Sequence, residues 1–183
     1  EARVMKMADG GFRPAVNAQL ATDTASQVIV GLDVGDVGSD HGELGPMLRQ
    51  LERRHGRAPH AMLVDNGFVN LGEIEALAQS HCGTTLYAPT TRPRDPTRDP
   101  HQPLPDDHPA VAAWRVRMGT PEAKAIYRER ASTAECVNAI ARNRGLVLLP
   151  VRGLAKARAV LLWFALAHNL MRTVALRRAA AAV

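Results

Sequence analysis

Residues 89–109 set the strongest limit on how this chain can fold, because seven of these 21 residues are proline. Proline lacks a backbone N–H donor, and the arginines and aspartates between the prolines leave little apolar surface to bury. We therefore expect a long extended loop that is mobile, with phosphate contact through its arginines as the alternative. This loop separates a first half that alternates strands with helices from a second half that is mainly helical.

The first half predicts a hairpin followed by a strand–helix–strand arrangement. Residues 15–22 and 28–34 have strand patterns on either side of turn residues, which indicates an antiparallel hairpin. The polar residues 1–14 are expected to be a loop. Apolar residues at helical spacing predict helices, and short apolar runs predict strands; the helices are expected at 44–55 and 71–79, and the strands at 62–64 and 84–88.

The strand at 62–64 ends in Asp65, which is followed by Asn66-Gly67, a strong turn signal. Two interpretations of Asp65 stay open at this point. The carboxylate either caps the helix that follows, or it belongs to a ligand site, because open α/β sheets collect ligands at the carboxyl ends of their strands.

Thr120-Pro121-Glu122 predicts the start of a long helix that runs to about Arg144 and ends at Gly145. Glu135 and Arg142 are seven residues apart on this helix, or two helical turns, so both should project from the same side. A short helix is predicted at 110–118, a strand or apolar connector at 146–151, and a last helix from residue 154. On that last helix His168 should be a packed, hydrogen-bonded core residue rather than a metal ligand.

The charge balance favours a polyanionic partner, because 23 Lys and Arg against 18 Asp and Glu give a net charge of +5. Many basic proteins bind no nucleic acid, so charge alone decides little. A chain of 183 residues suits one domain. The two cysteines have no metal-type spacing, which indicates a reducing cytosol. The longest apolar run, 159–167, is too short to span a membrane.

The chain resembles the catalytic domain of DDE transposases of bacterial insertion sequences, in the group related to the insertion-sequence 4 and 5 families. Asp65-Asn66-Gly67-Phe68 is similar to the block around the second acid of that group, and blocks 151–154 and 167–171 are similar to later ones. A further set looks like its Tyr–Arg–Glu–Lys signature: Tyr127, Arg130, Glu135 and Arg142. Glu135 lies one residue later from Arg130 than in most members, and Arg142 replaces the usual Lys.

The resemblance implies a ribonuclease-H-like α/β fold, a mixed sheet flanked by helices, with residues 1–183 forming one partial catalytic domain. It implies cleavage and strand transfer of double-stranded DNA at transposon ends and target, and it leaves open a homo-oligomer in the DNA complex. Asp65 and Glu135 would hold two Mg²⁺ or Mn²⁺ ions, since phosphoryl transfer uses paired cations bridged by carboxylates. Tyr127, Arg130 and Arg142 would contact DNA. From the residues alone, Arg130 could equally be a helix-surface charge and Tyr127 a half-buried aromatic. The setting would be the bacterial cytoplasm at the nucleoid, with no membrane partner.

The first acid of the family's triad, with its strand, is expected upstream of Glu1, so we expect residues 1–183 alone to cleave little. Asp9 is the alternative first acid, and four further aspartates are interpreted as structural: Asp23, Asp33, Asp36 and Asp40. Two rival functions stay open. One is a non-catalytic transposase remnant that at most binds DNA through basic charge; the other is a small α/β protein without a nucleic-acid role.

Overall fold

The computed structural model describes residues 3–7, 10–80, 83–93 and 95–182, which divide into two compact units. Unit 1 comprises residues 1–39 and 131–183, and unit 2 comprises residues 40–130. Strands and helices are both present, which confirms the α/β class. The strands of the described residues form three separate two-stranded sheets, rather than the single mixed sheet that was predicted.

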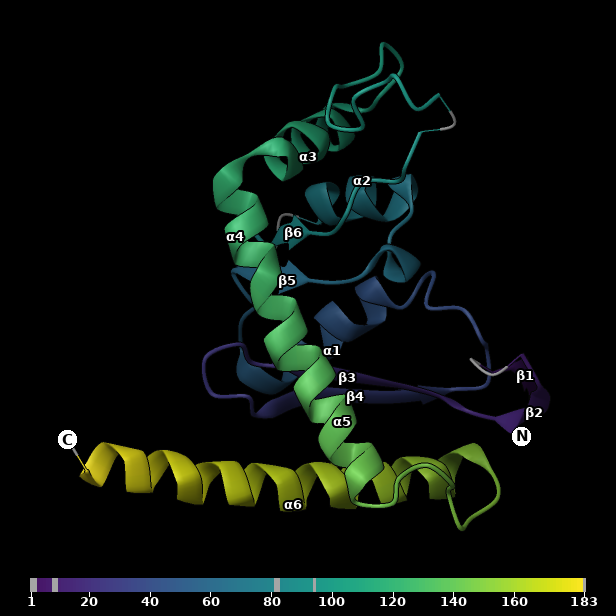
Figure 1. Cartoon of the computed structure of the whole chain (residues 1–183), viewed down its shortest axis with the longest axis vertical. Helices are drawn as coiled ribbons and strands as arrows, with labels where there is room; N and C mark the ends of the chain where they lie inside the picture. The colour runs from purple at the N-terminus through teal and green to yellow at the C-terminus, as the bar shows by residue number, and fades with distance from the viewer. Residues whose placement is uncertain (1–2, 8–9, 81–82, 94, 183) are drawn as a thin grey trace. The chain divides into compact units, whose positions relative to one another are not determined.

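Unit 2 is built on a parallel strand–helix–strand arrangement (Figure 1). Strand β5 (Ala61–Leu63) pairs in parallel with β6 (Thr85–Tyr87), and α2 (Leu71–Gln79) connects them. A parallel pair requires such a crossover, because a tight turn cannot return the chain to the same end of the sheet. Helix α1 (Leu44–His55) precedes β5 and ends at Gly56, whose φ of 72° suits a residue without a side chain. These elements were predicted to within about two residues.

Helix α3 (Pro109–Gly119) covers the outer edge of β6. Tyr87 accepts a hydrogen bond from the Val64 N–H on the β5 side, so the carbonyls of Leu86 and Ala88 point the other way. Arg117 Nη2 donates to Leu86 at 3.1 Å, and Trp114 Nε1 donates to Ala88 at 3.2 Å. The two side chains therefore satisfy backbone acceptors that a further strand would otherwise use.

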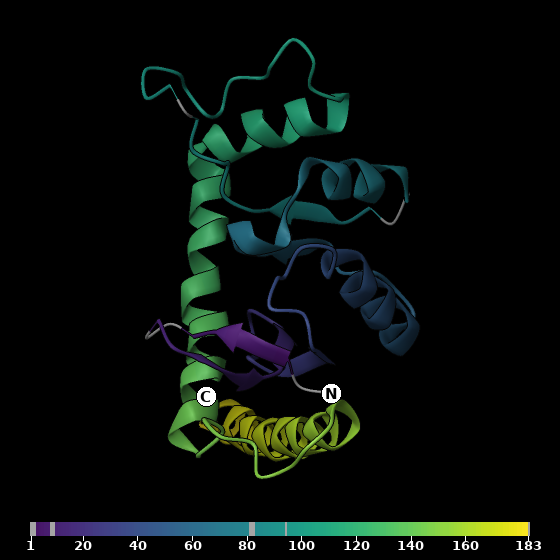
Figure 2. The ribbon, with the colours of Figure 1, turned by 90° about the vertical axis from the view of Figure 1, so that its right-hand side faces the viewer.

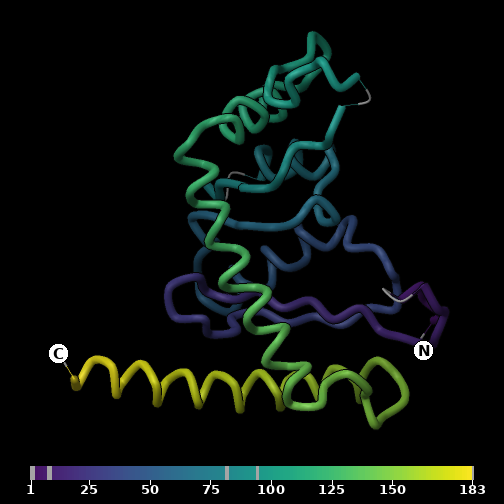
Figure 3. Tube along the Cα trace, in the orientation of Figure 1, coloured from purple at the N-terminus to yellow at the C-terminus, as the bar shows by residue number. Residues whose placement is uncertain are grey.

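The proline-rich segment before α3 has neither a helix nor a strand in its described residues, but it is a succession of turns (Figure 3). Asp95 and Asp99 each accept the backbone N–H two residues later. Asp107 Oδ2 accepts from Arg115 Nε at 2.7 Å, and the two side chains are only 3 % and 10 % exposed. These bonds attach the segment to α3 and give it more fixed structure than its composition indicated.

In unit 1 the predicted hairpin is confirmed, and α6 packs along it (Figure 1). Strands β3 (Asn17–Thr22) and β4 (Ile29–Gly35) pair antiparallel, and α6 (Leu154–Ala181) contacts β4. The Asn169 side chain bonds both the N–H and the carbonyl of Ile29, each at 2.8 Å. His168 is 2 % exposed and its Nε2 lies 2.9 Å from the Gln27 carbonyl, so the prediction of a packed, hydrogen-bonded histidine is confirmed.

The prediction of a loop at residues 1–14 is wrong for most of the described residues. Strands β1 (Arg3–Lys6) and β2 (Phe12–Ala15) form an antiparallel hairpin (Figure 2). Val4 and Phe12 are 65 % and 69 % exposed, so little apolar burial supports this hairpin. Its polar sequence carries no burial pattern, and periodicity therefore could not reveal it.

The long helix predicted from residue 121 to about 144 consists of three consecutive segments. They are α4 (Pro121–Arg130), the π-helical turn η2 (Ala131–Glu135) and α5 (Cys136–Asn143). Thr120 Oγ1 accepts the Ala123 N–H at 3.2 Å, which confirms the predicted cap. A π turn takes one more residue than an α turn, and that detail was not predicted. Residues 146–151 form a connector rather than a strand.

Helix α6 is long and apolar enough to cross a membrane by length and composition, with 22 % of its most apolar window buried in the structure. Core helices of soluble proteins meet the same criterion, so this property is weak evidence for a membrane segment. The hydrogen bonds from α6 to β4 and its preceding turn show what this helix does in the structure: it holds the hairpin of unit 1.

Candidate functional site

Asp65 lies two residues after the end of β5 and caps the short 3-10 helix η1 (Asn66–Phe68). Its backbone is extended, and its Oδ1 accepts the Gly67 N–H at 3.0 Å. The two interpretations left open for Asp65 are therefore compatible. The residue caps the following turn, and it also lies at the carboxyl end of a parallel strand, where α/β proteins place ligand sites.

The second carboxylate oxygen of Asp65 faces Arg130, the last residue of α4. Arg130 Nη2 donates to Asp65 Oδ2 at 3.0 Å, and the two side chains are 24 % and 44 % exposed. The two residues are 65 positions apart in the chain, and the segment between them folds back within unit 2 to bring the two groups together. Arg130, which was predicted to contact DNA, is thus the counter-charge of Asp65, which was predicted to hold a metal.

Tyr127 completes this group from one turn earlier on α4, at the i, i+3 spacing that places helix side chains side by side. Its ring is partly buried against the core of unit 2. Burial raises the pKa of Tyr127; the nearby Arg130 lowers this pKa and Asp65 raises it, with a net increase. Tyr127 therefore senses both members of the ion pair. The structure brings together three of the five predicted site residues.

A fourth group, Asp40, lies close to Asp65 although the sequence indicated only a structural role. A methyl group added to Gly67 would lie 3.1 Å from Asp65 Oδ1 and 3.6 Å from Asp40 Oδ2. The two carboxylate oxygens are therefore no farther apart than the sum of these distances. Gly67 leaves the space between them free of a side chain. Asp40 lies 25 residues before Asp65 in a loop, and no sequence spacing links the two.

Glu135 and Arg142 belong to unit 1, in the helical segments that follow Arg130. Glu135 is the last residue of η2 and is exposed, and Arg142 is exposed in the last turn of α5. That they meet Asp65 stays a prediction. Asp9, the alternative first acid, lies outside the described residues.

The carboxylates near Asp65 have the chemistry that a hard divalent cation prefers, since such ions take oxygen ligands. Asp65 and Asp40 approach each other, and a guanidinium already compensates Asp65. Across the described ranges, however, no three His, Cys, Asp or Glu side chains come together as a metal-binding group. The donor type therefore fits the predicted Mg²⁺ or Mn²⁺, while the number of ligands gathered in unit 2 falls short of a complete site.

Comparison with known proteins gives one match, a family model described as a transposase DDE domain, which covers residues 91–174. The matched range contains Tyr127, Arg130, Glu135 and Arg142, and it begins after Asp65. No curated protein and no solved structure matches the chain. The family match supports a DDE transposase, a class that transfers phosphoryl groups on DNA and normally uses divalent metals.

Proposed function

We propose that this chain is the catalytic domain of a DDE transposase of the insertion-sequence 4 and 5 group, acting on double-stranded DNA. The observation that carries the proposal is the meeting of Asp65, Arg130 and Tyr127 in unit 2. Tyr127 and Arg130 lie 62 and 65 positions after Asp65 in the chain, and the resemblance to the transposase family indicated all three. The transposase family match over residues 91–174 adds support from the second half of the chain.

In this proposal, Asp65 and Glu135 are ligands of the divalent cations, and Asp40 is a further carboxylate close to Asp65. A bound Mg²⁺ or Mn²⁺ pair would polarise the scissile phosphodiester and stabilise the leaving oxygen. The complete fold would be ribonuclease-H-like, with β5 as a strand of a larger mixed sheet. Assembly of more than one copy on DNA belongs to the same proposal.

The basic residues of the site have separate tasks. Arg130 balances the charge of Asp65 when DNA is absent, and Tyr127 packs beside it on α4. Arg142 is an exposed guanidinium on α5, suited to a bidentate contact with a phosphate. A phosphate near Arg130 would compete with Asp65 for the same guanidinium, so DNA binding and freedom of the Asp65 carboxylate would be linked.

The alternative is a transposase remnant that binds DNA without cleaving it. One observation favours it: the described residues gather no group of three metal ligands. Both functions share the DNA partner and differ in chemistry, so an assay of strand nicking separates them.

The test is a nicking assay with the protein produced from its complete gene, Mg²⁺ or Mn²⁺, and DNA that carries the element's ends. Asp65→Asn and Glu135→Gln should abolish nicking, because an amide keeps the shape of the carboxylate and loses the charge that holds cations. Both variants should still bind DNA, since Arg and Lys contact the phosphates, and Asp65→Asn, which removes the carboxylate that competes for Arg130, should bind at least as tightly as the parent protein. Glu122→Gln, a change at an exposed acid on α4, is the matched control and should nick normally.

Nicking that persists in Asp65→Asn would overturn the assignment of Asp65. A parent protein that binds the DNA ends and never nicks them would favour the remnant.

A further inference from the structure

The end of α1 carries a dense group of basic side chains that the Asp65 site does not use. Residues 49–60 contain four arginines and two histidines against one acid, Glu52. Twelve residues therefore hold a surplus of +3, while the whole chain has +5. We call this group the α1 basic surface; its members are Arg49, Arg53, Arg54, His55, Arg57 and His60.

The arginines of this surface are exposed, and no ion pair links them to another described residue. All four are in the exposed class, whereas the opposite face of α1 buries Leu44, Leu48 and Leu51. In the part of the chain that the structure describes, none of the four arginines forms a salt bridge with a carboxylate. Their charge is therefore available to a partner outside the chain.

Helix stability accounts for only part of this basic group. Cations in the last turn of a helix interact favourably with its negative end, which explains Arg53 and Arg54. That effect falls off within one turn, so it explains neither Arg49, one turn earlier, nor Arg57, beyond the helix end. Arg49 and Arg53 are also one helical turn apart, where like charges repel. The surplus of positive charge opposes helix formation at Arg49, so helix stability does not explain why it is there.

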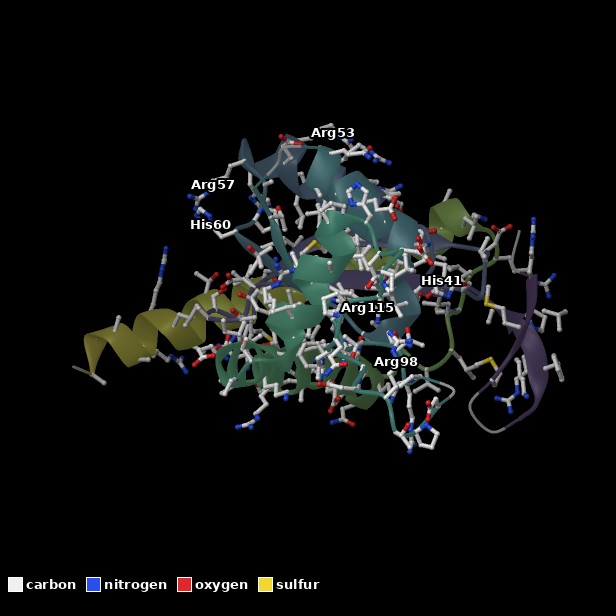
Figure 4. The ribbon with its side chains drawn as sticks, turned by 90° about the horizontal axis from the view of Figure 1, so that it is seen from above. His41, Arg53, Arg57, His60, Arg98 and Arg115 are labelled. Carbon is white, nitrogen blue, oxygen red and sulfur yellow. The ribbon has the colours of Figure 1, made fainter. Side chains whose placement is uncertain are left out.

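The basic residues lie on both sides of the turn at Gly56, which ends α1. Gly56 has a φ of 72° and its N–H bonds the Glu52 carbonyl, which reverses the chain at the end of α1. The residues that follow lead into β5, and Figure 4 shows Arg53, Arg57 and His60 pointing outward at the edge of unit 2. The surface thus combines two successive elements rather than one helix face.

We propose that the α1 basic surface binds the phosphate backbone of duplex DNA, as a contact surface separate from the Asp65 site. Exposed guanidinium groups without internal partners suit phosphate oxygens, which they can bind bidentately. The surface carries no Phe, Tyr or Trp side chain, the large aromatic platforms on which single-stranded bases stack. The proposed partner is therefore duplex, and its recognition is independent of sequence. This inference rests on the proposed function, because it assumes that the protein acts on DNA.

The test compares two triple variants with the same loss of charge, using the whole chain and a labelled duplex of arbitrary sequence. Arg53→Gln, Arg54→Gln and Arg57→Gln together remove three charges from the α1 basic surface. Arg152→Gln, Arg177→Gln and Arg178→Gln together remove three exposed charges from unit 1 and form the matched control. Affinity is measured by fluorescence anisotropy over a range of salt concentrations, and circular dichroism checks that each variant folds.

The first triple variant should bind more weakly and show a smaller dependence of affinity on salt. Each lost phosphate contact lowers the log–log slope by about 0.9, so three contacts lower it by nearly 3. The control should keep the parent slope. Arg49→Gln with Arg57→Gln is a second variant that leaves the last turn of α1 unchanged, and it should lower the slope by nearly 2.

Equal weakening in both triple variants would overturn the proposal, because general charge would then explain binding. Binding to anionic lipid vesicles or to single strands in preference to duplex would overturn it as well. These outcomes differ from failure of the proposed function. Duplex binding through this surface, with no Asp65-dependent nicking, would reject the transposase chemistry and keep the DNA contact.

Discussion

A single guanidinium, that of Arg130, sets the charge balance beside Asp65. Both side chains are partly exposed, and ion pairs of that kind contribute at most about 1 kcal/mol to stability. The fold therefore does not depend on this contact, and a phosphate or a metal ion could replace either partner at small cost. Weak pairing at the carboxyl end of β5 suits the exchange of partners that the proposed function requires of Asp65.

The electrostatic group around Tyr127 can be tested by titration. In a Tyr87→Phe background Tyr127 is the remaining tyrosine, so tyrosinate absorbance reports its pKa directly. Burial raises that pKa, Arg130 lowers it and Asp65 raises it. We therefore expect Arg130→Gln to raise the pKa further and Asp65→Asn to reduce it. Glu122→Gln on the same helix should leave it unchanged, and unchanged titration in all three variants would disprove the contact.

Three of the predicted site residues lie together in the structure, and each had been indicated by the sequence. Asp65 has a local signal, because it ends an apolar run before Asn-Gly, whereas Tyr127 and Arg130 were indicated by the resemblance to the transposase family. Asp40 has no such signal, since its approach to Asp65 depends on how the loop before α1 folds and on the small size of Gly67. Proximity of that kind arises from tertiary structure alone.

The proline-rich segment before α3 is held in place although its composition opposes packing. Asp107 is buried, which disfavours its charged form, but hydrogen bonds from the Leu104 N–H and Arg115 outweigh that and lower its pKa below 3.8. Gly119 contributes by close approach, since an added methyl group would lie 3.0 Å from His101 Cβ. Single side chains hold this segment, and its average composition does not reveal them.

Asp107→Asn should destabilise the protein at neutral pH by about 3 to 5 kcal/mol, because it leaves Arg115 buried without its counter-charge. Since the folded-state pKa of Asp107 is depressed, the ionised carboxylate stabilises the fold above its unfolded pKa. That contribution is lost as the pH falls through the folded value, so parent and variant should converge in acid. Urea denaturation across pH measures this, with the exposed Asp106→Asn as the control. A constant difference at all pH values would contradict it.

Helices and strands with clear periodicity were predicted well, and the exceptions have physical causes. The π turn at η2 falls within a helix whose apolar spacing continues on both sides, so the sequence pattern still indicates one helix. In the sequence, Glu135 lies one residue farther from Arg130 than in most members of the family that the chain resembles. A five-residue π turn between those positions can accommodate one additional residue, which gives that departure a structural explanation.

At the scale of the whole molecule, the chain has two units, each with its own hydrophobic core. The core of unit 2 includes Trp114 and Leu86, and that of unit 1 includes Leu32, Val137 and Phe164. The division was not predicted, because length alone suggested one domain and the segments of unit 1 come from both ends of the sequence. Contact between remote segments leaves no local pattern in a sequence.

The two tryptophans allow the units to be followed separately. Trp114 is 2 % exposed in unit 2, and Trp163 is 71 % exposed in unit 1. In a Trp163→Phe background, Asn169→Ala should lower the urea midpoint observed by circular dichroism, because it removes both side-chain bonds to Ile29, at about 1 to 3 kcal/mol. We expect the midpoint observed by Trp114 fluorescence to change little. A common shift of both midpoints would show that the chain unfolds as one cooperative system.

The hydrogen bonds from Trp114 and Arg117 of α3 to the β6 side limit where the sheet of β5 and β6 can gain a further strand. Since they occupy the outward carbonyls of Leu86 and Ala88, a further strand could pair only along the other edge of this sheet, at Ala61 and Leu63 of β5, where no strand of the described residues pairs. Further strands can therefore be added to this sheet on the β5 side only. An incoming strand, from this polypeptide or another, would lie next to the strand that leads to Asp65. The strand that completes the sheet would therefore also bring a residue beside the Asp65 carboxylate.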